Sequence, residues 1–108
     1  MTKHFNFSSL PEFDKEFSRL KKKYRTLDED LESFKFYQIK ISHELNIDNK
    51  GVFPISGIGV TVPKLFIAKK FACKSLKGKG SDTGIRIVYA YYEQEARIEW
   101  VEIYLKSE

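Results

Sequence analysis

The chain has few of the side chains that form disulfides or bind metals: its 108 residues include one cysteine, Cys73, and two histidines, His4 and His43. A single cysteine excludes an intramolecular disulfide, and nothing in the composition indicates an oxidising compartment. Neither histidine has a His or Cys at metal-ligand spacing, so we expect no metal site and no cofactor. Because no histidine base is evident for Cys73, we expect a half-buried strand residue there and not a catalytic thiol.

Long hydrophobic runs are also missing. No apolar stretch approaches the roughly 20 residues that a transmembrane helix needs, and the N-terminal sequence Met-Thr-Lys-His-Phe lacks the apolar region of a signal peptide. These absences predict a cytoplasmic protein without membrane contacts. A hydrophobic content of 42% in 108 residues is enough for the core of one small domain, which we expect to span residues 1–108.

Positive charge is abundant and is concentrated in one segment. The whole chain has a net charge of +4, whereas residues 64–86 alone carry seven cations against one acid, Asp82. The seven cations are Lys64, Lys69, Lys70, Lys74, Lys77, Lys79 and Arg86. Cations gathered on neighbouring strands and the loop between them are typical of a surface that meets phosphates, and a solvated basic face is the alternative interpretation.

Two capping patterns predict two consecutive helices. Ser9 and Glu12 form a Ser-x-x-Glu pair near the start of one apolar stripe, and Thr26 and Glu29 form an equivalent pair at the start of another, which continues towards Ser42. The apolar residues are Leu10, Phe13, Phe17, Leu20 and Tyr24 in the first stripe and Leu27, Leu31, Phe34 and Ile41 in the second. Because only about one or two residues separate the helices, we expect an antiparallel helical hairpin.

Four segments have the composition of strands. They are Lys3–Phe7, Lys64–Cys73, Gly84–Tyr92 and Arg97–Leu105, and a short polar turn between the last two favours a hairpin. Between Asn46 and Pro63, repeated glycines and prolines break every period, so we expect a long apolar loop. The β-α-α-β-β-β order predicts an α+β fold: an antiparallel β-sheet with an N-terminal two-helix hairpin packed on one face.

Side-chain alternation separates Arg86 from the predicted core. We expect Ile85, Ile87, Tyr89 and Tyr91 to face the helices, and Arg86, Val88, Ala90 and Tyr92 to face the other side. Neighbouring cations, with Tyr92 and Tyr104 as aromatic groups, can bind an RNA backbone and stack bases. The same groups can promote attack of a ribose 2′-hydroxyl on its own phosphate, because positive charge stabilises the pentavalent transition state.

Three further segments follow one another in a recognisable order. They are Phe71–Gly80 (FACKSLKGKG), Gly84–Tyr91 (GIRIVYAY) and Ile98–Tyr104 (IEWVEIY). In this order, and after a β-α-α beginning, they resemble the RelE/ParE-type toxins of type II toxin–antitoxin systems, also called plasmid stabilisation or addiction-module toxins. The resemblance covers nearly the whole length of the chain.

The resemblance implies the toxin component of a toxin–antitoxin pair, of the kind that acts as a ribosome-dependent mRNA endoribonuclease and blocks translation. Arg86 then matches the strand arginine that contacts the scissile phosphate. Lys69 and Lys70 fall near the basic pair on the preceding strand, and Lys106 lies where a second cation follows the last strand. Tyr92 and Tyr104 are the residues that could stand in for the proton-transferring residue, and we expect Tyr104 to do so. The residues expected to bind RNA are Lys74, Lys77, Lys79 and Tyr92.

The resemblance also implies partners, namely a cognate antitoxin protein, the ribosome and mRNA. The expected contact surfaces for an antitoxin or a second copy are the apolar segment Val52–Val62 and the helical hairpin. The oligomeric state is left open between a homodimer and a toxin–antitoxin hetero-oligomer.

Two other functions are compatible with the sequence. Family nucleases commonly continue after the last strand with a segment that carries a Tyr or His for proton transfer, whereas here two residues follow Lys106 and no histidine follows His43. One alternative is therefore a non-catalytic relative that binds antitoxin or RNA only. The other is a DNA gyrase inhibitor of the ParE type, which needs no catalytic residues.

Overall fold

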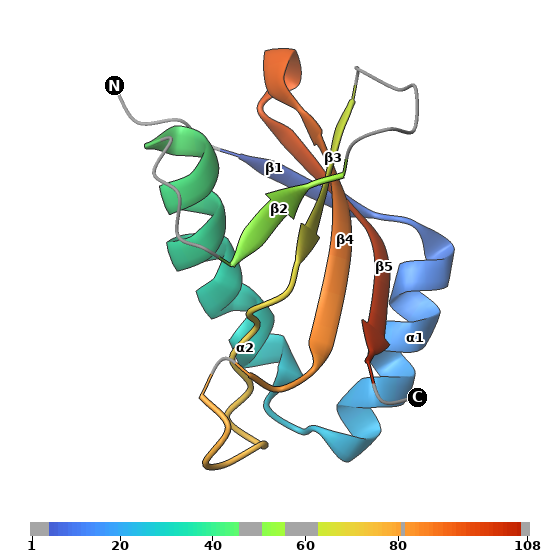
Figure 1. Ribbon diagram of the computed structural model, residues 1–108. Coiled ribbons are helices and arrows are strands. Elements are labelled where there is room, and N and C mark those ends of the chain that lie inside the picture. The colour runs from blue at the N-terminus through green and yellow to red at the C-terminus, as the bar shows by residue number, and fades with distance from the viewer. Residues whose placement is uncertain (1–4, 46–50, 56–62, 81, 107–108) are drawn as a thin grey trace.

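The computed structural model describes residues 5–45, 51–55, 63–80 and 82–106. Within them, five strands form one sheet in the order β1-β5-β4-β3-β2, with α1 beside β5 and α2 on the side of β2 (Figure 1). The strands are β1 Asn6–Ser9, β2 Val52–Pro54, β3 Lys64–Ala68, β4 Ile85–Tyr92 and β5 Arg97–Leu105; the helices are α1 Pro11–Lys23, α2 Leu27–Phe34, the π-helix η1 Lys35–Glu44 and the short 3-10 turn η2 Glu93–Glu95. The predicted α+β class is confirmed.

The sheet is mixed and not antiparallel, as the sequence had led us to expect. β1 pairs with β5 in parallel, with Phe7 opposite Ile98, while the other neighbouring strands are antiparallel. The alternation of a strand indicates which residues are buried but not the direction of its neighbour, so this pairing has no signature in the sequence. Of the predicted first strand Lys3–Phe7, residues 3 and 4 lie outside the described residues, and β1 itself spans Asn6–Ser9.

The segment expected to be a loop contains a strand. β2 pairs antiparallel with β3, with Phe53 opposite Ile67 and Pro54 opposite Phe66. Proline is tolerated here because β2 is an edge strand, where one side of the backbone needs no ladder partner. Glycine and proline therefore concealed a strand of three residues. The rest of the predicted contact segment, residues 56–62, lies outside the described residues.

Both helices begin near their predicted positions, but neither capping box forms. Ser9 Oγ donates to Asp14 Oδ1 at 2.6 Å, and Thr26 Oγ1 donates to Asp30 Oδ2 at 2.8 Å. Each hydroxyl thus bonds to a carboxylate one turn further along the helix. The prediction was wrong because the same polar spacing permits either a backbone or a side-chain partner.

The second helix does not remain α-helical as far as Ser42. From Lys35 it continues to Glu44 as the π-helix η1, in which backbone hydrogen bonds span five residues and not four. The wider turn directs Ile39 and His43, four residues apart, into the core, and both are buried. Ile41, which the helical period placed in the apolar stripe, is only half-buried.

Trp100 in β5 is the centre of the core and is 3% exposed. Its ring lies 5.6 Å from that of Phe7 in β1, 6.0 Å from Phe13 in α1, 6.2 Å from Phe34 in α2 and 5.7 Å from Tyr89 in β4. Aromatic rings from four elements therefore meet on one residue. Because both helices contribute to this cluster, they cover the same face of the sheet. Among the described residues, no helix packs on the opposite face, which we call the open face.

A buried hydrogen bond ties η1 to the sheet. His43 Nε2 and Tyr89 Oη lie 2.7 Å apart, and the imidazole also packs against the rings of Phe66 and Tyr91. Burial raises the pKa of the Tyr89 hydroxyl well above its ordinary value. The folded chain therefore retains this proton at pH values at which the unfolded chain has lost it.

We predict that Tyr89→Phe lowers the free energy of unfolding at pH 7 by about 1–3 kcal/mol, because a buried polar partner is lost. In the wild type, the raised pKa of Tyr89 contributes stability below about pH 10 that falls by up to about 1.4 kcal/mol per pH unit above it. The variant should lose this part of the alkaline decline in urea titrations at pH 9–11. Tyr104→Phe, on the open face, is the control and should change neither quantity; equal behaviour of the two variants would contradict the prediction.

Candidate nucleic-acid interface

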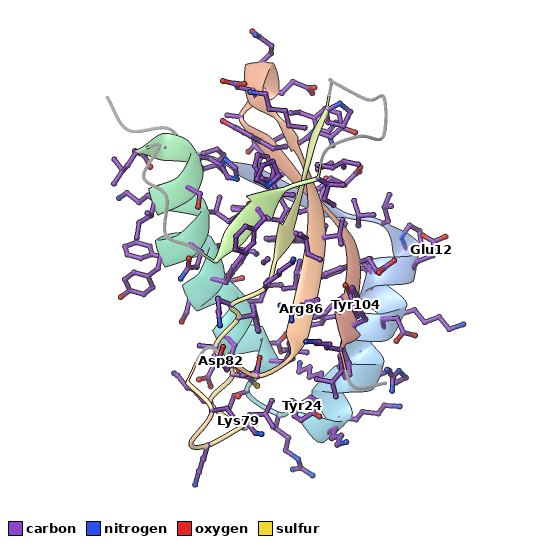
Figure 2. The ribbon with its side chains drawn as sticks, in the orientation of Figure 1. Glu12, Tyr24, Lys79, Asp82, Arg86 and Tyr104 are labelled. Atoms are coloured by element: carbon purple, nitrogen blue, oxygen red, sulfur yellow. The ribbon has the colours of Figure 1, made fainter. Side chains whose placement is uncertain are left out.

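Arg86 lies on the open face of the sheet, opposite Tyr104 (Figure 2). Its neighbours Ile85 and Ile87 are fully buried, so the predicted alternation along β4 is confirmed around Arg86. Arg86 Nη1 donates a hydrogen bond of 2.8 Å to the backbone oxygen of Lys69. The guanidinium is thus held by the backbone of a neighbouring segment as well as by its own strand.

The strand ends at Ala68, five residues before its predicted end at Cys73, and the chain leaves the ladder at Lys69. Lys69 N donates to Gly51 O at 2.8 Å, and Lys69 O accepts from the Arg86 side chain, so neither group is paired with β4. The ammonium of Lys69 lies 5.2 Å from the centre of the Phe53 ring. Lys69 therefore lies on the open face between Phe53 and Arg86.

The side chain of Lys70 points away from the face that carries Lys69. Its ammonium forms an ion pair with Asp82 on the loop before β4, and the side chain also lines a hollow of about 120 Å³ beside Phe34 and Tyr37. The hydrogen bond from Lys70 and its charge, with a smaller effect of Arg86, lower the pKa of Asp82 below its ordinary value. The two consecutive lysines thus diverge, and only Lys69 shares the face of Arg86.

Lys106 lies at the same end of the sheet as Arg86. Its backbone N donates to Gly84 O at 2.8 Å, which places it beside the start of β4, and its side chain is exposed. We call Lys69, Arg86, Tyr104 and Lys106 the Arg86 cluster. The structure brings these four predicted site residues together.

The other predicted residues lie around the cluster or away from it. Lys74, Lys77 and Lys79 are exposed on the loop between β3 and β4, and the ammonium of Lys74 lies 3.3 Å from Glu29 Oε2. Tyr92 lies six residues from Arg86 along β4, which is about 20 Å in a strand. Its ring packs 3.8 Å from the guanidinium of Arg97. The structure therefore does not bring Tyr92 to the Arg86 cluster.

The loop between β3 and β4 carries Lys74, Lys77 and Lys79, and we call it the lysine loop. Hydrogen bonds attach it to the start of α2. Asp30 is 5% exposed, and its carboxylate accepts hydrogen bonds from Thr26 Oγ1 at 2.8 Å and from Lys74 N at 3.2 Å. Ser75 N donates to Thr26 Oγ1 at 2.9 Å, and Thr26 N donates to Ser75 Oγ at 3.1 Å. These reciprocal bonds determine where the loop leaves the core, and so where Lys77 and Lys79 are presented.

Glu102 and Phe53 are candidate site residues on the open face that the sequence analysis did not include. Glu102 lies opposite Val88 on the same face as Tyr104, and the alternation of β5 could have identified it. Phe53 lies on β2, which the sequence did not reveal.

The surroundings of Cys73 bear on its reactivity. Cys73 is buried, and burial raises the pKa of its thiol, which opposes formation of a reactive thiolate. Within residues 5–45, 51–55, 63–80 and 82–106, no group of three His, Cys, Asp or Glu side chains is arranged to bind a metal. In the same ranges, no helix is long and apolar enough to cross a membrane.

No protein-family model matches the sequence, and no curated protein matches it. Among solved structures, the chain is similar to one in the crystal structure of the archaeal RelE–RelB complex from Pyrococcus horikoshii OT3, at 16% sequence identity and a TM-score of 0.57. The similarity covers 100% of this chain and 99% of that chain. At this identity it shows a shared fold, which is the RelE-like fold that the sequence predicted.

We predict that Asp30→Asn loosens the lysine loop. An amide in place of the buried carboxylate weakens two hydrogen bonds to a charged acceptor, and the free energy of unfolding should fall by about 1.5–3 kcal/mol. Hydrogen exchange at the Lys74 amide should accelerate. Asp28→Asn, an exposed change in the same turn, should alter stability by no more than about 0.5 kcal/mol. Unchanged exchange at Lys74 would show that the loop is held by other contacts.

We further predict that Asp82→Asn strengthens binding to a single-stranded phosphate polymer such as polyuridylate. The change releases Lys70 from its carboxylate, and one additional phosphate contact should steepen the dependence of log K on log salt by about 0.7. Asp28→Asn removes the same charge from an ion pair with Lys21 on the helix corner and is the matched control. An equal salt slope in both variants would indicate a general charge effect and contradict the prediction.

Proposed function

We propose that this chain is the toxin component of a type II toxin–antitoxin pair and acts in the cytoplasm as a ribosome-dependent mRNA endoribonuclease. The main support is Arg86, held on the open face by Lys69 O and lying opposite Tyr104. An arginine fixed in this way, with Lys69 and Lys106 at the same end of the sheet, suits a phosphate that becomes more negative during a reaction. The RelE-like fold agrees with this assignment.

The proposed reaction is transfer within the RNA strand. The ribose 2′-oxygen bonds to the adjacent phosphorus as the bond from phosphorus to the 5′-oxygen breaks, giving a cyclic phosphate and a free 5′-hydroxyl. Negative charge grows on the non-bridging oxygens in the transition state. A guanidinium has five N–H donors, and the bond to Lys69 O uses one of them, so the others can bind these oxygens.

Proton transfer needs an acceptor for the 2′ proton and a donor for the 5′-oxygen. Tyr104 lies directly opposite Arg86, and Glu102 lies one pair further along the same face. Diagonal neighbours in antiparallel strands are about 7–8 Å apart, which one nucleotide can span. We assign the carboxylate of Glu102 as the acceptor and the hydroxyl of Tyr104 as the donor. His43 is not suited to either role because it is buried against Tyr89 on the helix face.

The proposed partners are the ribosome with its mRNA and a cognate antitoxin. The solved structure that shares this fold is a RelE–RelB complex, which motivates the antitoxin assignment. An antitoxin that neutralises this activity must prevent RNA from reaching the Arg86 cluster, either by covering it or by displacing the segment that carries Lys69.

We predict that controlled expression of the wild type arrests growth and produces new, translation-dependent cuts in a reporter mRNA, as detected by primer extension. Arg86→Ala should reduce the cleavage rate about 100- to 1,000-fold, the usual effect of removing a donor to a developing oxyanion. Arg86→Lys should remain strongly impaired because one ammonium cannot replace the guanidinium fork. Arg97→Ala, an arginine at the other end of the sheet, is the control and should retain activity.

Other outcomes would identify the alternatives. Growth arrest with intact mRNA and a DNA-damage response would indicate a gyrase inhibitor. Absence of arrest and of cleavage would indicate a relative that only binds antitoxin or RNA, and would refute the nuclease proposal.

A further inference from the structure

Phe53 is a large apolar side chain that the fold leaves at the surface. It is 40% exposed on the edge strand β2, and its pairing with Ile67 places it on the open face of the sheet. A single exposed aromatic ring is common on a protein surface, so its surroundings decide whether it can take part in binding.

The surroundings of Phe53 are positively charged. The Lys69 ammonium lies 5.2 Å from the ring centre, and the carbonyl of Lys69 accepts the hydrogen bond from Arg86. Lys69 therefore contacts both residues: its ammonium lies near Phe53, and its backbone oxygen bonds to Arg86. An apolar ring with one cation beside it and a second cation further along the same face suits a ligand that has both a flat apolar surface and negative charge.

The register of the sheet gives the separation. Ile67 pairs with Phe53 on one side and with Val88 on the other, and Val88 is two residues from Arg86 on the same face. Neighbouring strands are about 4.8 Å apart and successive residues about 3.4 Å, so Phe53 lies about 10 Å across the sheet and about 7 Å along it from Arg86, which is about 12 Å in all. This span lets a base reach Phe53 while a phosphate of the same or the next nucleotide lies at Arg86.

We propose that Phe53 is a base-stacking platform for single-stranded RNA whose scissile phosphate lies at Arg86. In the bound state the Lys69 ammonium exchanges its contact with the ring for a phosphate of the stacked nucleotide. Stacking on an aromatic side chain with backbone charge neutralised alongside is a general way to bind unpaired bases, and it tolerates any base. This inference rests on the proposed function, since it extends the same site.

A second exposed aromatic pair makes a suitable comparison. Phe36 and Tyr37 on η1 are 63% and 60% exposed, and their rings contact each other 5.0 Å apart. Lys40, in the same helix, lies 5.4 Å from the Phe36 ring. This pair also combines rings with a cation, but no contact joins it to Arg86. Phe36→Ala therefore controls for the loss of an exposed ring beside a lysine.

The test measures binding of a short single-stranded RNA by fluorescence anisotropy. Phe53→Ala should weaken binding about 5- to 100-fold, the usual effect of removing one stacking residue, while Phe53→Tyr and Phe36→Ala should bind like the wild type. An RNA with an abasic nucleotide at the stacked position should bind the wild type and Phe53→Ala equally. In Phe53→Trp, RNA should quench the added emission, and the buried Trp100 of the wild type provides the background.

The outcomes separate this inference from the function on which it rests. If Phe53→Ala binds RNA like the wild type while Arg86→Ala has lost binding and cleavage, stacking is refuted and the nuclease proposal stands. If Phe53→Ala is weakened equally with intact and abasic RNA, the ring only supports the strand and the inference is overturned. Quenching of Phe53→Trp by a purified antitoxin but not by RNA would assign the ring to a protein partner, and also refute it. If the wild type neither binds nor cuts RNA, both proposals fail.

Discussion

The packing of aromatic rings on Trp100 is the interaction on which the rest of the structure depends. Rings from β1, α1, α2 and β4 meet there, and buried aromatic side chains contribute some of the largest apolar areas in a small core. Both helices are thereby committed to one face of the sheet. Alternation along β4 and β5 then determines which side chains can meet a ligand, because the side chains that do not point towards Trp100 point to the open face.

Segment 64–86 has less unpaired positive charge in the folded chain than its sequence suggests. Among the residues that the structure describes, carboxylates pair with three of the seven cations of segment 64–86: Glu93 with Lys64, Asp82 with Lys70 and Glu29 with Lys74. Two of these acids come from outside the segment, so local charge counting could not include them. The residues left at the Arg86 cluster are few but well placed, since Lys69 contributes its carbonyl to Arg86 and its ammonium to Phe53. Placement, more than the number of cations, distinguishes this face from an ordinary basic surface.

The sequence was informative where one face of an element had to be buried. The alternation that separates Ile85 and Ile87 from Arg86 predicted both the strand β4 and the position of Arg86 on the face away from the core. Local spacing was less reliable where one pattern permits several partners. The hydroxyls of Ser9 and Thr26 bonded to carboxylates in place of cap amides, and the change from α-helix to π-helix moved His43 into the core. The parallel pairing of β1 and the divergence of Lys69 and Lys70 arise from long-range contacts, which a sequence pattern cannot express.

Edge strand β2 explains why a ligand would meet the open face and not the edge of the sheet. A short strand that contains proline cannot offer a full row of backbone donors, so Pro54 opposes the addition of a further strand at this edge. The same strand is too short to hide Phe53, whose ring remains at the surface next to Lys69. The proline that made this segment look like a loop thus has a structural consequence. Pro54 opposes strand pairing at the edge, and the short strand leaves the side chain of Phe53 exposed. An unpaired base, which needs a ring surface and a nearby cation but no backbone ladder, is the ligand that such an edge can accept.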